Sequence, residues 1–317
     1  MSPITDVLVL LSGGQDSTTC LALARETYAD ARLHALTVFY GQRHATEVTS
    51  AKAIANTLGC ATHTVLDLSA VFAASDAALL SKSTGPLRAD GGIVDADAPK
   101  GLPTSFVPGR NLVFLSVAGA HAAALGAGVI VTGVCQTDYS GYPDCRRFFV
   151  EAMAVAINEA MPTGLRPIRL ETPLMNLTKA DSVALMVDLA KREASRTASK
   201  WQQTAVWRAL RVSVTCYRGS RPGCATCPAC LLRAKGFEEA GVTDPMMEWR
   251  PPTIGETLDR AAPVMEAMAE IDRADAVLAL AHADTVVKRH ESTCADSWCD
   301  VCYPEAQTGE FAPRGSR

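Results

Sequence analysis

The sequence lacks three features that would place it in other classes of protein. No apolar stretch approaches the roughly 20 residues that a bilayer-spanning helix needs, and the opening residues, MSPITDVLVLLSGG, lack the cationic region of a secretory signal. The formal net charge is −4 over 317 residues, so no overall basic field favours bulk nucleic-acid binding. Hydrophobic residues make up 48% of the chain, enough for an ordinary core. We expect a cytoplasmic globular protein, for which a small nucleotide-like ligand is still open.

Cysteine, in contrast, is abundant, with eleven residues in the chain. Cys216 precedes the motif CATCPAC, which contains Cys224, Cys227 and Cys230. In a chain without a secretory signal, Cys-x-x-Cys spacing more often indicates metal than disulfides. Four thiolates at this spacing predict a tetrahedral zinc site that is structural, because a full shell leaves no open position for catalysis. The alternatives are a redox Cys-x-x-Cys pair or free buried cysteines.

Strand-like and helix-like segments alternate in the first half of the chain. Apolar runs predict strands at residues 7–11, 34–40, 61–68 and 129–133, and helical spacing predicts helices at 17–29, 44–59 and 112–125. Residues 73–102 read as a long loop or lid. This order predicts an α/β fold with a doubly wound, mostly parallel sheet, whose ligands sit at the carboxyl ends of the strands.

The first predicted strand ends in LLSGGQDSTTC, which contains two glycines, an acid and several hydroxyl groups. One interpretation is a tight turn, with Ser12 or Asp16 capping the next helix. The other is an anion site, because backbone N–H groups and a helix N-terminus can bind phosphate. The loop is too short for a Walker A motif and has no lysine after its glycines. The match to the pyrophosphate loop of ATP pyrophosphatases favours the anion site, with Asp16 placed for a Mg²⁺ contact.

Three further segments carry polar side chains near predicted strand or helix ends. The segment GVCQTDYSGYPDCRRFF concentrates donors, acceptors and rings suited to a purine-like ligand: Asp138, Tyr139, Ser140, Tyr142, Asp144, Arg146 and Arg147. In FVPGRNLVFLS, Arg110 could reach a phosphate, and in PLMNLTKAD, Lys179 lies near a helix start. Taken alone, these are a polar loop, an exposed arginine and a solvated lysine.

Together the motifs resemble the 7-cyano-7-deazaguanine synthase family of the queuosine pathway. The matching stretches are LLSGGQDST, YGQRHATE, FVPGRNLVFLS, TDYSGYPDCR, ETPLMNLTKAD and CYRGSRPGCATCPACLLRAKGFEEAGV, in the family's order. The resemblance implies that the carboxylate of 7-carboxy-7-deazaguanine attacks the α-phosphate of ATP, that ammonia displaces AMP to give an amide, and that a second ATP activates the amide for loss to the nitrile. It also suggests a homodimer. Because no glutaminase domain is visible in the sequence, we expect free ammonia as the nitrogen source.

The resemblance and the positions of the residues in the predicted fold together suggest particular roles, and the substrate-binding roles rest on position. Catalysis is expected to involve Asp16, Arg110, Lys179 and Asp138. The ATP loop is expected to comprise Leu11, Ser12, Gly13, Gly14, Gln15, Ser17 and Thr18. Substrate binding is expected from Tyr40, Gln42, Arg43, Tyr139, Ser140, Tyr142, Asp144 and Arg146. The cofactors implied are ATP, Mg²⁺ and Zn²⁺.

The chain departs from the family after the cysteine motif, where it continues for about seventy residues. We expect a nucleotide-binding domain at 1–190, an insertion with the Cys₄ region at 191–248, and a helical, cysteine-containing extension at 249–317. The extension allows two interpretations. A second zinc site could be formed by His290, Cys294, Cys299 and Cys302, or the three cysteines could be free. For the function, the alternative is a diverted paralogue that joins the acid to another amine, for example on a protein in phage defence, and stops at an amide. A non-catalytic nucleotide- and zinc-binding module is a further alternative, which the intact SGGQDS argues against, and a tRNA-thiolating enzyme is disfavoured by the negative charge.

Overall fold

The computed structural model describes residues 3–42, 46–75, 77, 79–80, 105–136, 142–162 and 166–248. Several predicted features lie outside these residues: most of the 73–102 loop, Arg43, Asp138, Tyr139, Ser140 and the tail candidates His290, Cys294, Cys299 and Cys302.

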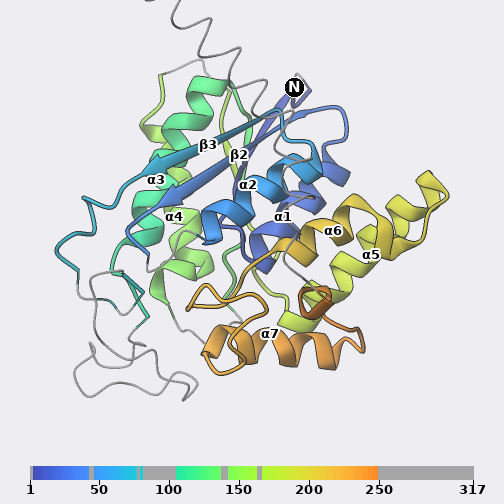
Figure 1. The fold of residues 1–317 in the computed structure, drawn as a ribbon. Coiled ribbons are helices and arrows are strands. Elements are labelled where there is room, and N and C mark those ends of the chain that lie inside the picture. Colours follow the sequence, from blue (N-terminus) through green and yellow to red (C-terminus); the bar gives the residue numbers. More distant parts are fainter. Residues whose placement is uncertain are drawn as a thin grey trace, which may run out of the picture. The chain divides into compact units, whose positions relative to one another are not determined.

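A five-stranded, fully parallel sheet forms the centre of the described chain, in the order β3-β2-β1-β4-β5 (Figure 1). The strands are β1 (Asp6–Leu10), β2 (Arg32–Phe39), β3 (Thr62–Asp67), β4 (Val129–Val131) and β5 (Arg169–Glu171). The predicted α/β fold with a parallel sheet is therefore confirmed. Strand order reverses beside β1, which places the end of β1 at the topological switch point where such sheets bind ligands.

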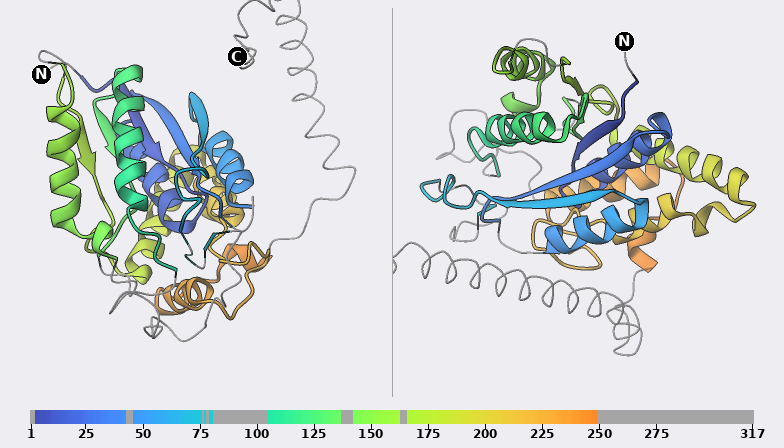
Figure 2. Two further views of the ribbon diagram at one scale, coloured as in Figure 1. Left: turned by 90° about the vertical axis from the view of Figure 1, so that its left-hand side faces the viewer. Right: turned by 90° about the horizontal axis from the view of Figure 1, so that it is seen from above.

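Helices cover both faces of the sheet (Figure 2). Alternation along β1 explains this, because Val7 and Val9 pack into one hydrophobic cluster and Leu8 into another. The first cluster includes residues of α1 (Gln15–Thr27), α2 (Thr46–Leu58), α5 (Lys179–Thr197) and α6 (Ala205–Val212). The second includes residues of α3 (Arg110–Leu125) and α4 (Arg147–Glu159). Each face of the sheet is thus buried under helices.

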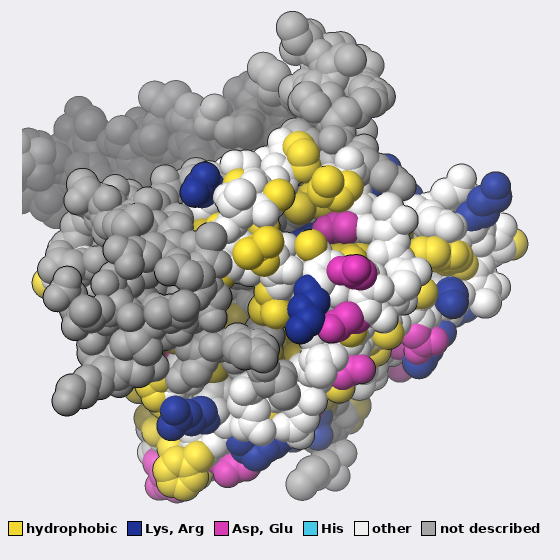
Figure 3. Space-filling model, turned by 90° about the horizontal axis from the view of Figure 1, so that it is seen from below, with side chains coloured by type: hydrophobic (Ala, Val, Ile, Leu, Met, Phe, Trp, Pro, Cys, Tyr) yellow, Lys and Arg dark blue, Asp and Glu magenta, His cyan; other side chains and the backbone are white. Residues whose placement is uncertain are grey.

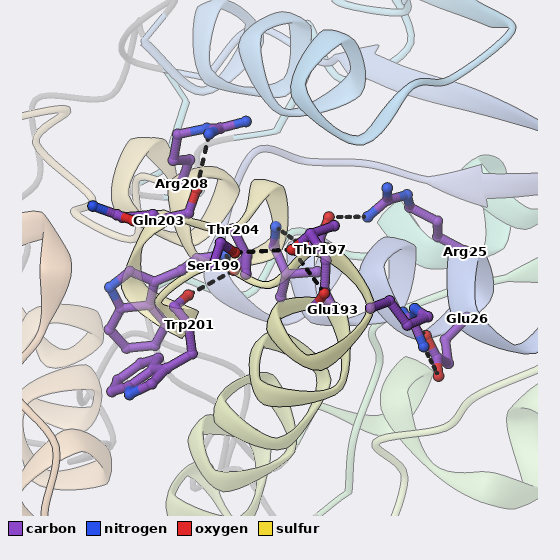
Figure 4. Close-up of polar contacts among 12 residues, drawn as sticks. Arg25, Glu26, Glu193, Thr197, Ser199, Trp201, Gln203, Thr204 and Arg208 are labelled. Carbon is purple, nitrogen blue, oxygen red and sulfur yellow. Dashed lines mark hydrogen bonds and ion pairs between the residues drawn. The ribbon is translucent and has the colours of Figure 1, made fainter.

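The segment WQQTAVWRAL forms a short 3-10 helix, η2 (Trp201–Gln203), followed by α6. The rings of Trp201 and Trp207 meet edge to face with centroids 4.6 Å apart. Glu193 of α5 accepts hydrogen bonds from the Arg25 side chain at 3.0 Å and from the backbone N–H of Val206 at 3.0 Å, as part of the network in Figure 4. These contacts pack α6 against α5 and α1 as part of the core.

The last described helix is α7 (Pro228–Glu239), and two more 3-10 helices are η1 (Pro143–Cys145) and η3 (Pro245–Glu248). Figure 3 views the molecule from the α7 side, where acidic, basic and hydrophobic side chains are interspersed. Within the described ranges, none of the helices combines the length and apolar character needed to cross a bilayer.

Candidate functional site

The loop between β1 and α1 is a glycine turn organised by two serines. Gly13 has a φ of +87°, a backbone conformation that would be strained for a residue with a side chain. Ser12 Oγ lies 3.0 Å from Ser17 Oγ and accepts the N–H of Gly14 at 3.2 Å. Gly14 is the N-cap of α1 without a side-chain cap. The loop therefore presents hydroxyl groups and the positive end of a helix at the carboxyl end of β1, as an anion site requires.

An ion pair joins this loop to the start of α5. Lys179 Nζ donates to Asp16 Oδ2 at 2.7 Å, and the two side chains are 9% and 27% exposed. Lys179 is the first residue of α5, whose N-terminus is fixed by a capping box between Thr178 and Asp181. An ammonium and a carboxylate thus lie side by side at the anion-binding loop.

A cavity of about 620 Å³ opens at the carboxyl ends of β1, β2 and β4. Its charged lining side chains are Asp16, Glu47, Arg110, Lys179 and Lys235, and its aromatic ones are Tyr40, Phe114, Tyr142 and Tyr217. Residues Leu10–Ser12 and Gly14–Ser17 line it from the loop. The cavity therefore combines an anion-binding end with aromatic surfaces suited to a planar ring.

Arg110 stands between two aromatic rings of the cavity. Its guanidinium carbon lies 5.6 Å from the centroid of the Tyr40 ring and 5.8 Å from that of Tyr142, within cation–π range. Burial raises the pKa of Tyr40 to about 12, so its phenol stays protonated at neutral pH. Among the described residues no carboxylate forms an ion pair with this guanidinium. Arg110 thus offers a cation to an anionic ligand in the cavity.

The four clustered cysteines lie beside the cavity. The sulfur atoms of Cys216, Cys224, Cys227 and Cys230 all lie within 4.8 Å of one another. A tetrahedral zinc with bonds of about 2.3 Å places its sulfurs about 3.8 Å apart, so these residues fit the ion. Cys227 is the N-cap of α7, and Cys216 follows shortly after Val214 and Thr215, which line the cavity.

The sequence matches the family model for "Queuosine biosynthesis protein QueC" over residues 6–241. The chain belongs to the QueC family. Among curated relatives, the 7-cyano-7-deazaguanine synthase of Gloeobacter violaceus is 44% identical over 77% of this chain and 96% of the relative. Those of Chromobacterium violaceum and Laribacter hongkongensis are 46% and 45% identical, each over 76% of this chain and over 92% and 93% of the relatives. The resemblance stated from the motifs is confirmed.

Two solved structures share less sequence with this QueC family member than these relatives do. An NAD⁺ synthetase from Burkholderia pseudomallei is 19% identical, with a TM-score of 0.31 over 76% of this chain and 83% of that one. A 4-thiouridine synthetase–RNA complex with bound ATP is 13% identical, with a TM-score of 0.35 over 75% and 50%.

The residues predicted from QueC motifs divide into two groups in the structure. Those that line the cavity are Leu11, Ser12, Gly14, Gln15, Asp16, Ser17, Tyr40, Gln42, Arg110, Tyr142 and Lys179. Gly13 in the loop and Thr18 in the first turn of α1 do not line the cavity, and Arg146 is the N-cap of α4. Asp144 is buried, and its Oδ2 accepts the backbone N–H of Asn111 at 3.1 Å, so it fixes the first turn of α3.

Sequence reasoning assigned no role to several lining residues: Glu47, Phe114, Cys135, Cys145, Thr215, Tyr217 and Lys235. Glu47 is the most informative of these. Its Oε2 accepts from Gln42 Nε2 at 3.4 Å, while Gln42 Oε1 accepts the backbone N–H of Tyr40 at 2.9 Å. Burial raises the pKa of Glu47 to about 7, against the opposing effects of Arg110 and Gln42. The sequence could have pointed to Glu47 through its place in the motif YGQRHATE, which directly follows a predicted strand.

Proposed function

We propose that this chain converts 7-carboxy-7-deazaguanine and ammonia to 7-cyano-7-deazaguanine at the expense of ATP. The observation that carries the proposal is the anion-binding loop with its Asp16–Lys179 pair at one end of a cavity that also holds Arg110 and aromatic rings. The names of relatives at 44–46% identity support the product. ATP as the activating substrate follows from the chemistry, because a carboxylate oxygen is a poor leaving group until it becomes part of AMP.

In the first step, a carboxylate oxygen of the substrate attacks the α-phosphorus of ATP, and the bond to the β-phosphate oxygen breaks to release pyrophosphate. The loop hydroxyls of Ser12 and Ser17 and the N-terminus of α1 bind the departing pyrophosphate. Lys179 and Arg110 compensate the negative charge on the phosphates and the carboxylate. The contribution of the protein is therefore positioning and electrostatic stabilisation.

In the second step, ammonia attacks the acyl carbon, AMP leaves with the former carboxylate oxygen, and a proton is lost to give the amide. The amide oxygen then attacks the α-phosphorus of a second ATP. Loss of AMP and of the remaining amide protons leaves the nitrile. Formation of each nitrile thus consumes two ATP and releases two AMP and two pyrophosphate. One site serves both activations, because in each an oxygen of the substrate attacks the α-phosphorus of an ATP molecule.

Two metals are proposed with different roles. Mg²⁺ binds few protein carboxylates together with phosphates, and Asp16 is the cavity carboxylate beside the anion-binding loop, so it fits this cation. Bound there, Mg²⁺ would neutralise phosphate charge. The Cys₄ cluster fits Zn²⁺ and would hold the residues around Thr215 and α7 against the cavity.

Product analysis by mass spectrometry tests the proposal. The chain is incubated with ATP, Mg²⁺, the deazaguanine acid and ammonium, with Asp16→Ala as the control. Nitrile and two AMP per nitrile are expected from the wild type, and neither from the variant. Absence of AMP release with any acceptor would refute enzymatic activity and leave a binding module.

The long segment that lies outside the family match, residues 242–317, favours a second candidate function. We propose, as the alternative, that the chain adenylates the same acid and transfers it to another amine, stopping at an amide. In the assay above, this enzyme would release one AMP per turnover and form no nitrile. The count of AMP per product therefore separates the two functions.

A further inference from the structure

Glu47 stands out because it is a partly buried carboxylate that the chemistry above does not use. It lies in the first turn of α2 and lines the cavity. Among the described residues, the only other acid that lines the cavity is Asp16, which is engaged with Lys179. Glu47 therefore supplies the cavity with negative charge at a second point.

The position of this carboxylate is fixed from one side only. Gln42, itself 6% exposed, accepts from the backbone of Tyr40 and directs its amide N–H toward Glu47 Oε2. No described residue donates a hydrogen bond to Oε1. An ionised carboxylate accepts hydrogen bonds through both of its oxygens, so a carboxylate that lines a cavity can accept donors from a bound ligand. The geometry calls for a ligand that brings donors.

The neighbouring surfaces indicate the shape of that ligand. Tyr40 contacts Phe114 with ring centroids 5.5 Å apart, and both line the same cavity as Glu47. Aromatic side chains of this kind bind planar rings. The ligand expected beside Glu47 is thus a flat heterocycle with hydrogen-bond donors on its edge.

We propose that Glu47 reads the pyrimidine edge of a guanine-type base by accepting its ring N1–H and its exocyclic 2-amino group. This assignment rests on the proposed function and specifies how the substrate is recognised. A guanine edge offers two adjacent donors that match the two carboxylate oxygens. An adenine edge offers one amino donor beside a ring acceptor, whose lone pair would face the carboxylate. The pairing therefore favours the deazaguanine acid over the adenine of ATP at this point.

Binding calorimetry with an edge-deleted ligand tests the assignment. Wild type, Glu47→Gln and the control Glu159→Gln, an exposed acid on α4, are titrated with 7-carboxy-7-deazaguanine and with its analogue lacking the 2-amino group, in the presence of α,β-methylene ATP. Hydrogen bonds to a charged group predict that wild type and E159Q prefer the amino ligand by roughly 10- to 100-fold. In E47Q the preference should fall below about threefold, because the amide replaces one acceptor oxygen with an NH₂ group, which is itself a donor and would face a donor of the ligand.

Three outcomes would overturn the assignment. The first is a wild type that binds both ligands equally, a measurement that does not depend on any variant folding. The second is an E47Q protein that keeps the wild-type preference. The third is an E47Q protein that, when titrated with α,β-methylene ATP alone, has lost affinity for it while keeping the wild-type affinity for the acid, which would place adenine beside Glu47. In each of these outcomes, a wild type that binds the acid and releases AMP in the product assay keeps the proposed function, and only the assignment of Glu47 fails. A wild type that binds neither the acid nor its analogue would refute the proposed function as well.

Discussion

Replacing Gly236 with alanine should damage catalysis far more than folding. Gly236 lies in α7 against the first residue of α5, and an added Cβ would stand 2.8 Å from Cγ, 3.0 Å from Cβ and 3.1 Å from the carbonyl carbon of Lys179. Carbon atoms normally approach to about 3.5–4.0 Å, so the two helices must separate by roughly 0.7–1 Å. The clash involves the root of the lysine side chain, and a rotation of its tip cannot relieve it.

The opposing effects on stability nearly balance. Alanine is favoured over glycine inside a helix by about 1 kcal/mol, whereas overpacking costs about 1–3 kcal/mol. The free energy of unfolding should therefore fall by about 0–2 kcal/mol. The hydrogen bond from Lys179 Nζ to Asp16 is 2.7 Å long, and a shift of about 1 Å would break it. Misplacement on that scale lowers rates by up to about 100-fold.

The assay combines the rate of AMP release with urea denaturation. Gly119→Ala is the matched control, because Gly119 also lies inside a helix and its Cβ would stand 3.0 Å from two side-chain carbons of Ile157, away from the cavity. We expect G119A to keep the wild-type rate and G236A to lose most of it at similar stability. A G236A protein with the wild-type rate would refute the reasoning that Lys179 must be held by α7.

Three further predictions concern the loop, the metal and the buried acid. Gly13→Ala should abolish AMP release, because the φ of Gly13 is +87° and the new Cβ would lie 2.3 Å from the Glu47 carbonyl oxygen. The control Gly59→Ala should keep AMP release, because Gly59 has a similar φ of +74° but open space around its Cβ position. An active G13A protein would contradict this prediction. Elemental analysis should find about one zinc ion per chain in the four-cysteine cluster, lost in Cys224→Ser; two ions in wild type would instead support the tail site. Burial raises the pKa of Glu47 from 4.5 to about 7. The folded state then binds more protons than the unfolded state in that window, so wild type should lose stability relative to E47Q as the pH rises from about 4.5 to 7. Urea denaturation of ligand-free protein at pH 5 and pH 8 measures this, and a constant difference would exclude it.

The sequence predicts those parts of the fold that depend on local patterns. The runs around Val7 and Ile130 are buried on both faces, so they are apolar throughout and easily recognised. In contrast, β5 was not predicted, because it is a three-residue edge strand, Arg169–Glu171, with no buried residue. An edge strand paired on one side needs no hydrophobic run, and the backbone pairing with β4 that defines it leaves no mark on composition.

The candidate site shows the same division. The glycine loop and the cysteine spacing are short motifs, and both were predicted with their residues. The Asp16–Lys179 pair joins residues 163 positions apart, so only the packing of α5 against α1 reveals it. Asp144, which is predicted to bind substrate, accepts the backbone N–H of Asn111 through Oδ2, a contact that the sequence does not reveal. Residue type shows which chemistry is available, but the partner of a buried carboxylate is a property of the tertiary structure.

Val214 lies two residues before Cys216, the first cysteine of the four-cysteine cluster, and its backbone N–H donates to the carbonyl of Gly13 at 2.8 Å. Phosphate binding and metal binding are thus mechanically adjacent, although the motifs stand about two hundred positions apart in the chain. Under the proposed function, loss of the metal ion would loosen the segment around Val214, and with it the glycine turn that this segment holds.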